Sequence, residues 1–236
     1  MIFYNLIVIF TGAAIGSFIE LLSYRRINNM DFIYDRSRCE ICNHIIPLYF
    51  NIPIISYLFL KGRCSYCNSK IRLENFIIEV LFALLFFILY KLYDIFNFIL
   101  FSAMLSVLFL ISLLDIKEKN IYFSDVILLL IIEGIYIYKL GLISIYNFIS
   151  GFVMFLLFFI IILLTDSMGE GDAILSIAAG LIADNPYDLL CVFGEIFIFA
   201  SIFSVLFVFT HYKSIKDSIA FAPYICFIIF FNIICL

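Results

Sequence analysis

Four cysteines occur as two closely spaced pairs in a short polar stretch of the sequence. Cys39 and Cys42 form the first CxxC pair, and Cys64 and Cys67 form the second after 21 intervening residues. Two residues between cysteines let a tight turn point both sulfur atoms at one metal ion, and a second such turn completes a tetrahedron. The pattern therefore predicts a structural zinc site with four thiolates, which leaves no open position for a catalytic water.

Disulfide bonds and thiol redox chemistry are the alternatives for these cysteines. Disulfides need an oxidising compartment, and we expect this stretch to be cytoplasmic. A redox CxxC usually accompanies a thioredoxin-like βαβ pattern, which the sequence lacks. His44 follows the first pair closely but is expected to be a bystander. Cys191, Cys226 and Cys235 lie in apolar stretches, where they are expected to pack.

Two aspartates stand at the ends of apolar stretches. Asp115 ends one of them, and Asp172 closes a Gly-x-Gly-Asp motif whose glycines, Gly169 and Gly171, let the backbone bend or approach a substrate strand. If the two aspartates meet at one membrane level, their repulsion keeps one protonated while the other is ionised. The ionised group can then activate water, and the protonated one can polarise a peptide carbonyl. From position alone, a simple helix-end charge is the alternative.

The composition defines the elements that must position these groups. The chain has 236 residues, of which 66% are hydrophobic and 14% are charged, and Phe occurs 30 times. Soluble domains are about half apolar and about a quarter charged, so a soluble globular domain is excluded. Intrinsic disorder is excluded because disordered chains are poor in aromatic and aliphatic residues. A polytopic membrane protein is the class that fits.

Eight apolar stretches are candidates to cross the membrane, which takes about 20 mostly apolar residues per helix. They are 2–22, 76–90, 96–114, 126–138, 148–164, 174–183, 189–210 and 219–234. We expect an all-α membrane bundle of about eight transmembrane helices, with the short sixth stretch shielded by other helices or re-entrant. The first stretch lacks the features of a cleavable signal and is expected to be retained. Its Gly12 and Gly16 would allow another helix to approach closely.

The basic residues predict the orientation of these helices. Of 14 Lys and Arg residues, 8 lie between Arg25 and Arg72. Placing that loop in the cytoplasm puts twelve basic residues inside, including Arg36, Lys213 and Lys216, and leaves only Lys91 and Lys139 outside. We therefore expect three parts: a first transmembrane helix at 1–24, a cytoplasmic zinc-binding loop domain at 25–75, and a membrane domain at 76–236.

The other acidic residues carry weaker expectations. Glu20 and Glu79 are expected to pair with nearby arginines or to help shape the site, and neither Glu133 nor Glu195 has an assigned role. A further group is expected to be solvated at the same face as the two aspartates. This group consists of Glu118, Asp125, Asp166 and Glu170.

A series of short motifs runs in order along nearly the whole chain. It comprises Gly12-x-x-Ile15-Gly16-Ser17-Phe18, Arg36-Ser37-x-Cys39-x-x-Cys42, Asn51-Ile52-Pro53-Ile54-x-Ser56-Tyr57-Leu58, Gly62-Arg63-Cys64-x-Tyr66-Cys67, Glu79, Asp115, Gly169-x-Gly171-Asp172 and Ala222-Pro223-Tyr224. Together they resemble the type IV prepilin peptidase family, the membrane aspartic proteases with a GxGD motif. The ordered set is far more specific than any one of its motifs.

This resemblance implies an activity, cofactors and partners. It implies removal of a short basic leader from prepilin or pseudopilin substrates at the cytoplasmic face of a bacterial inner membrane, with Asp115 and Asp172 as the catalytic pair and 76–236 as the aspartic peptidase domain. It also implies methyl transfer from S-adenosylmethionine to the new N-terminal residue, and a zinc loop formed by the four cysteines. No nucleic acid is expected as a partner. The sequence has no Rossmann-type glycine fingerprint, so the donor-binding residues are not predicted.

Three positions depart from the pattern of the family. Tyr122 stands where a proline is usual, Ile174 where a lysine is frequent, and Glu20 where an asparagine is frequent. These changes leave the aspartate pair in place but put the details of substrate fit and of methyl transfer in doubt. The alternatives are a peptidase without methyltransferase activity, a transporter or channel, and a zinc-stabilised scaffold. A transporter would not account for the cysteine loop.

Overall fold

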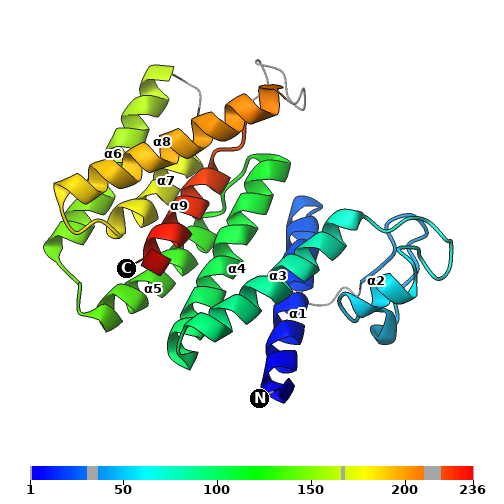
Figure 1. Ribbon diagram of the computed structural model, residues 1–236. Helices are drawn as coiled ribbons and strands as arrows, with labels where there is room; N and C mark the ends of the chain where they lie inside the picture. Colours follow the sequence, from blue (N-terminus) through cyan, green and yellow to red (C-terminus); the bar gives the residue numbers. More distant parts are fainter. Residues whose placement is uncertain (1, 31–36, 166–167, 210–218, 236) are drawn as a thin grey trace. The chain divides into compact units, whose positions relative to one another are not determined.

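The computed structural model describes residues 2–30, 37–165, 168–209 and 219–235 (Figure 1). Within these ranges the regular elements are helices, and β-pairing is limited to two isolated bridges, so the all-α prediction is confirmed. The chain divides into two compact units, Met1–Ser102 and Ala103–Leu236, which we call the N-terminal and the C-terminal unit. The expected boundaries at 24/25 and 75/76 stay predictions.

The N-terminal unit is built on two long helices that pack along each other. Its elements are α1 (Ile2–Ile27), the short 3-10 helix η1 (Leu48–Phe50), α2 (Ile55–Phe59), α3 (Leu73–Leu92) and the first turns of α4 (Ile95–Glu118). Between α1 and α3 the chain is mostly irregular. We call residues 37–72 the cysteine loop.

Small residues bring α1 and α3 together, as the sequence predicts. A Cβ added to Gly12 would lie 2.6 Å from the carbonyl oxygen of Phe82, and one added to Gly16 would lie 3.0 Å from that of Ile78. Neither gap admits a side chain, so the helix backbones approach directly. Phe82 itself is fully buried at this contact.

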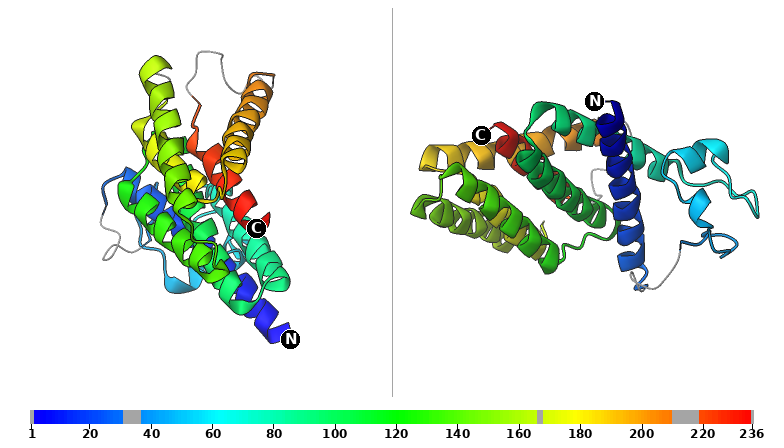
Figure 2. Two further views of the ribbon diagram at one scale, coloured as in Figure 1. Left: turned by 90° about the vertical axis from the view of Figure 1, so that its left-hand side faces the viewer. Right: turned by 90° about the horizontal axis from the view of Figure 1, so that it is seen from below.

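The C-terminal unit surrounds one short helix with longer ones. Its elements are the rest of α4, then α5 (Phe123–Leu140), α6 (Ile145–Thr165), α7 (Glu170–Leu181), α8 (Pro186–Phe209) and α9 (Ala222–Cys235). Helix α7 contacts α5, α6, α8 and α9 (Figure 1 and Figure 2). Its backbone touches that of α6, since a Cβ added to Gly180 would lie 2.6 Å from the Ser150 carbonyl oxygen. The expectation that the sixth apolar stretch is shielded by other helices is thereby confirmed.

Five of the described helices are long and apolar enough to cross a membrane. They are α1, α3, α4, α6 and α8. Each of the other three expected spans also coincides with a helix, but α7 has 12 residues and is therefore about 18 Å long, against about 30 Å of hydrocarbon. The protein is thus a multi-pass membrane protein, and the count of eight spans stays a prediction. Three of the basic residues used for the orientation, Arg36, Lys213 and Lys216, lie outside the described residues.

Candidate active site and metal centre

The first CxxC pair lies on a tight turn closed by backbone hydrogen bonds. The Cys39 N–H donates to the His44 carbonyl at 3.0 Å, and the Asn43 N–H donates to the Cys39 carbonyl at 2.9 Å. Asn43 adopts a positive φ of 54°, a conformation that asparagine accepts more readily than most residues. An isolated bridge between Arg38 and Ile45 closes the base of the turn.

The second pair repeats this design at each corresponding position. The Cys64 N–H donates to the Ser69 carbonyl at 2.9 Å, and the Asn68 N–H donates to the Cys64 carbonyl at 3.0 Å. Asn68 has a φ of 57°, and Arg63 and Lys70 form the matching bridge. Two copies of one turn therefore present two cysteines each.

The two turns bring all four sulfur atoms to one point. The Sγ atoms lie within 4.8 Å of one another, and the Sγ atoms of Cys39 and Cys67 are 3.8 Å apart. A tetrahedral zinc ion with Zn–S bonds of about 2.3 Å requires sulfur atoms about 3.8 Å apart. The cluster of Cys39, Cys42, Cys64 and Cys67 therefore fits a metal ion such as zinc.

Local hydrogen bonds favour the thiolate form of two of the cysteines. Burial raises the pKa of the Cys39 thiol, but hydrogen bonds with the Cys42 and Ile41 backbone and with Ser69 outweigh it and lower this pKa to about 6. Hydrogen bonds with the Ser69 side chain and backbone lower the pKa of Cys67. A backbone hydrogen bond with His44 lowers the pKa of Cys42, but burial and hydrogen bonds with the other three cysteines outweigh it and raise this pKa to about 11. Thiolates are the form of cysteine that binds metal ions, so Cys39 and Cys67 favour a bound cation, whereas Cys42 would lose its proton on binding one.

The remaining histidine and cysteine expectations have mixed outcomes. His44 packs against Tyr66 of the other turn, with ring centroids 3.6 Å apart and the ring planes tilted by 37°, and is not part of the metal-binding cluster. Cys226 is buried, as expected for a packing residue. The prediction that Cys191 and Cys235 pack inside the chain is wrong, because both are exposed on the surfaces of their helices.

Asp115 lies on the last turn of α4 and is buried, with 5% of its surface exposed. Its Oδ2 atom accepts a hydrogen bond of 2.9 Å from the backbone N–H of Ala222, the first residue of α9. This contact gives the Ala222-Pro223-Tyr224 motif a structural role. The start of α9 fixes the carboxylate from a position 107 residues further along the chain.

Asp172 lies on the first turn of α7 and is equally buried, with 6% exposed. Its Oδ2 atom accepts a hydrogen bond from the Gly169 N–H at 3.2 Å, and its own N–H donates to the Gly169 carbonyl at 3.0 Å. Its Oδ1 atom is buried and has no hydrogen-bond partner among the described residues. An unpaired buried carboxylate oxygen is costly, which marks it as a group available to a proton or a substrate.

The fold brings Asp115 and Asp172 together in the C-terminal unit. They lie close enough for their charges to interact, and Cys226 on α9 lies close enough to interact electrostatically with both. Gly171 permits this arrangement locally, since a Cβ there would lie 2.8 Å from that of Ile121 in the link from α4 to α5. The two glycines thus have separate roles: Gly169 supplies backbone hydrogen bonds, and Gly171 supplies space.

The other acidic residues depart in part from expectation. Glu118 and Glu170 are exposed, as expected, and Asp166 lies outside the described residues. Asp125 is buried, with 4% exposed, so the expectation that it is solvated is wrong. It faces inward on the first turn of α5, a position that apolar periodicity alone would have indicated.

Three glutamates that the sequence left without a firm role have specific surroundings. Glu79 on α3 accepts a hydrogen bond of 2.7 Å from the Ile54 N–H. Glu195 on α8 accepts one of 2.9 Å from Asn232 on α9. Glu133 is fully buried in α5, and neither of its oxygens has a partner in the part of the chain that the structure describes.

Comparison with known families accounts for both units. Residues 10–93 match the bacterial peptidase A24 N-terminal domain, and residues 102–209 match the type IV leader peptidase family. The chain belongs to the type IV leader peptidase family. The second match begins at residue 102, one residue before the boundary of the compact units at 102/103, so each part of the family pattern corresponds closely to one structural unit.

Curated relatives in the type IV leader peptidase family support the assignment. Three of them, each described as a prepilin leader peptidase/N-methyltransferase, come from Myxococcus xanthus, Vibrio cholerae and Neisseria gonorrhoeae. The first is 37% identical over 76 residues, which cover 32% of this chain and 23% of the relative. The second is 38% identical over 84 residues, covering 32% and 33%. The third is 31% identical over 166 residues, covering 60% and 55%.

The matches cover only part of the length of each relative. The chain spans between about a quarter and about half of the length of the three relatives. No solved structure shows significant similarity to it.

Proposed function

We propose that the protein is a membrane aspartic endopeptidase that removes the basic leader from type IV prepilin-like substrates at the cytoplasmic face. The observation that carries the proposal is the meeting of two buried aspartates, Asp115 and Asp172, in the unit that matches the leader peptidase family. One of their oxygens, Asp172 Oδ1, has no hydrogen-bond partner among the residues that the structure describes. A structural ion pair would not leave such an oxygen unpaired.

The chemistry follows from two carboxylates at one site. Like charges at short range disfavour double ionisation, so the pair holds one proton between them. The ionised aspartate takes a proton from water as it attacks the scissile carbonyl, while the protonated one donates to the carbonyl oxygen. The backbone N–H groups of Ala222 and Gly169 each hold one carboxylate in place through its Oδ2 atom. No acyl-enzyme forms, because water is the nucleophile.

The surroundings of the pair suit a substrate with a basic leader and an apolar segment. Glu118 follows Asp115 at the end of α4, and Glu170 precedes Asp172 at the start of α7; both are exposed. Their charges would attract lysines or arginines of a leader at the membrane interface. The substrate's apolar segment would lie in the bilayer beside the apolar helices.

The proposal extends to a second activity and to a metal. The relatives' shared description names an N-methyltransferase, and we propose that this chain N-methylates the new N-terminal residue with S-adenosylmethionine. Zinc would be held by the four cysteines with a structural role, since four thiolates leave no position for water. A protein that cleaves but does not methylate is the alternative.

Two conservative substitutions test the peptidase assignment. Asp115→Asn and Asp172→Asn keep the size of each side chain but cannot exchange the proton, so leader removal in membranes should fall about 10²–10⁴-fold in each. Glu74→Gln, which changes an exposed carboxylate at the start of α3, should leave the rate unchanged. Full activity in either asparagine variant would sink the dyad assignment.

One measurement separates the bifunctional protein from a peptidase alone. Mass spectrometry of a co-expressed prepilin reads leader removal and methylation of the new N-terminus in the same sample. The bifunctional proposal expects a mature pilin carrying one added methyl group. A mature but unmethylated pilin would overturn the methyltransferase part and leave the peptidase part standing.

A further inference from the structure

The N-terminal unit contains a cavity of about 480 Å³ between α1, the cysteine loop and the start of α3. Its volume falls within the roughly 300–1,000 Å³ of small-molecule sites. All of its lining residues belong to this one unit, and neither Asp115 nor Asp172 is among them. They include Ala14, Glu20, Tyr24, Asn43, Arg72 and Asn75.

Two polar groups in the wall of the cavity are buried. Glu20 is only 4% exposed, although a carboxylate on a membrane helix is costly to bury. The Oδ1 atom of Asn75 is buried and accepts no hydrogen bond from any described residue. Buried polar atoms are nearly always hydrogen-bonded, so this oxygen points to a partner beyond the described residues, such as a ligand in the cavity.

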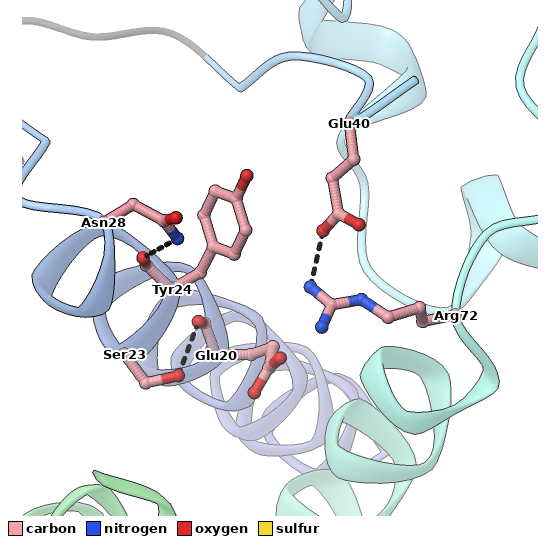
Figure 3. Close-up of polar contacts among 6 residues, drawn as sticks. All are labelled: Glu20, Ser23, Tyr24, Asn28, Glu40 and Arg72. Atoms are coloured by element: carbon pink, nitrogen blue, oxygen red, sulfur yellow. Dashed lines mark hydrogen bonds and ion pairs between the residues drawn. The ribbon is translucent and has the colours of Figure 1, made fainter. Parts of the chain in front are cut away.

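The rim of the cavity links three parts of the unit. Arg72, at the start of α3, forms an ion pair with Glu40 between the first two cysteines. Its guanidinium also lies 5.7 Å from the centre of the Tyr24 ring on α1. Figure 3 shows Glu20 and Tyr24 on α1 facing the space that Arg72 and Glu40 enclose from the other side. Charges of both signs and an aromatic ring therefore surround one space.

A strained backbone segment forms another part of the wall. Ile52 and Pro53 line the cavity, and the next residue, Ile54, has a φ of 63°, which is rare for a β-branched side chain. Glu79 holds it by accepting the Ile54 N–H, and the Ser17 side chain, also in the wall, hydrogen-bonds Glu79. Strain of this kind persists where the surroundings enforce it, and such positions cluster at binding sites.

We propose that this cavity binds the methyl donor, S-adenosylmethionine, which rests on the methyltransferase activity proposed above. The donor carries a carboxylate, an ammonium group, a sulfonium, ribose hydroxyls and an adenine ring. The wall offers matching chemistry: arginines for the carboxylate, Glu20 for cationic or hydroxyl groups, and Tyr24 for a ring or a sulfonium. The Asn75 oxygen accepts a hydrogen bond from an amino or hydroxyl group.

This site gives a role to two features that the peptidase chemistry does not use, namely the cavity itself and the cysteine loop. The cavity lies in the unit matched by the A24 N-terminal domain, and the aspartate pair lies in the other unit. Donor binding and peptide hydrolysis would therefore depend on different residues of one chain. The cysteine loop contributes Arg38, Cys39 and Asn43 to the wall, so the metal would shape the donor site without taking part in catalysis.

Binding of radiolabelled S-adenosylmethionine to the purified full chain in detergent tests the proposal directly. Asn75→Ala removes the unpaired acceptor, and Ala14→Phe fills the cavity from α1; each should weaken donor binding at least tenfold. The matched controls are Ile7→Phe, at an exposed position of α1, and Asn5→Ala, which removes a half-buried amide that accepts a hydrogen bond from Lys91. Neither residue lines the cavity, so donor binding should stay within twofold of the parent in both. Zinc content and thermal unfolding show whether each variant is folded. If Ala14→Phe does not fold, donor binding by Asn75→Ala decides the test.

The outcomes separate this proposal from the proposed function. Asp115→Asn should lose leader cleavage and keep full donor binding, since it lies in the other unit. If the parent binds the donor and both cavity variants bind it equally well, the assignment of the site is wrong. The assignment is also wrong if the parent does not bind the donor. A parent that binds the donor in the cavity but neither cleaves nor methylates prepilin would overturn the proposed function and leave the site standing.

Discussion

The cysteine loop and the C-terminal unit position their polar groups by different means. In the loop, large apolar side chains such as Ile41, Leu48 and Phe59 are exposed by 70%, 74% and 76%, so little apolar burial holds it. Its geometry comes from the two matching turns and the four gathered thiols. In the C-terminal unit, Asp115 and Asp172 lie beside the fully buried Leu114 and Leu175, and close helix packing holds them.

This difference predicts what each region is sensitive to. A loop without an apolar core depends on the free energy of metal binding, as small metal domains do. A site between close-packed helices depends on side-chain volume, because packed interiors adjust poorly to added atoms. Perturbations of the metal and of the packing should therefore have separable consequences.

Loss of the metal should give the largest effect, and it should be confined to the loop. Cys64→Ser replaces the buried cysteine of the cluster, and we expect loss of bound zinc, since structural zinc contributes on the order of 10 kcal/mol to folding of its site. Metal analysis and limited proteolysis of residues 37–72 measure the change. The exposed Cys191→Ser is the control and should retain all of the zinc.

The same variant sharpens the contrast between the regions. Helix content and the thermal transition of the C-terminal unit should stay close to those of the parent in Cys64→Ser. Collapse of both units together on zinc loss would show that the metal supports the whole chain, against the separation argued here.

A packing change in the C-terminal unit should lower leader cleavage and leave the zinc content of the loop unchanged. Gly180→Ala places a Cβ 2.6 Å from the Ser150 carbonyl oxygen, which would push α7 away from α6 at a cost of about 2–3 kcal/mol. Leader cleavage should fall while the zinc content is unchanged, as read by thermal unfolding in detergent and a cleavage assay. Gly134→Ala is the control, because no atom lies within 4 Å of its added Cβ; that variant should be neutral or stabilised by about 0.5–1 kcal/mol.

The contrast also explains what the sequence could predict. The CxxC pairs and the GxxxG step of α1 are local patterns whose geometry is fixed by spacing, and both expectations agree with the structure. The hydrogen bond from Ala222 to Asp115 joins residues 107 positions apart. Apolar periodicity carries no information about such a pairing, and only the ordered motifs of the family indicated that the start of α9 matters.

Burial of charged residues was the least predictable feature. Asp125 was expected in solvent and is buried, whereas Glu118, three residues beyond Asp115, is exposed as expected. Both lie at ends of helices, where an acidic residue is commonly solvated, and the helical spacing of Asp125 with the buried Leu129 and Ile132 was the signal that it faces inward. The cavity of the N-terminal unit was not foreseen either, since its walls come from α1, the cysteine loop and α3.

A moderate effect is expected at the contact that holds the strained segment. Glu79→Gln removes the charge from the acceptor of the Ile54 N–H, and charge-assisted hydrogen bonds are worth about 1.5–3 kcal/mol against about 1 kcal/mol for neutral ones. We expect a loss of about 1 kcal/mol in unfolding free energy, together with weaker donor binding because Ile52 and Pro53 line the cavity. Glu195→Gln weakens the bond to Asn232 in the other unit and should leave donor binding unchanged.

The smallest effect tests the backbone of the turns themselves. Asn68 has a φ of 57°, and an alanine there would pay about 1 kcal/mol for the left-handed conformation, whereas glycine adopts it freely. Asn68→Ala should therefore weaken zinc affinity about fivefold, and Asn68→Gly should match the parent in a competition assay with a chelator. Because Asn43 holds the equivalent position at a φ of 54°, Asn43→Ala should reproduce the loss. Equal effects at the two sites would show that the turns contribute alike to one metal centre, and clearly unequal effects would contradict that equivalence.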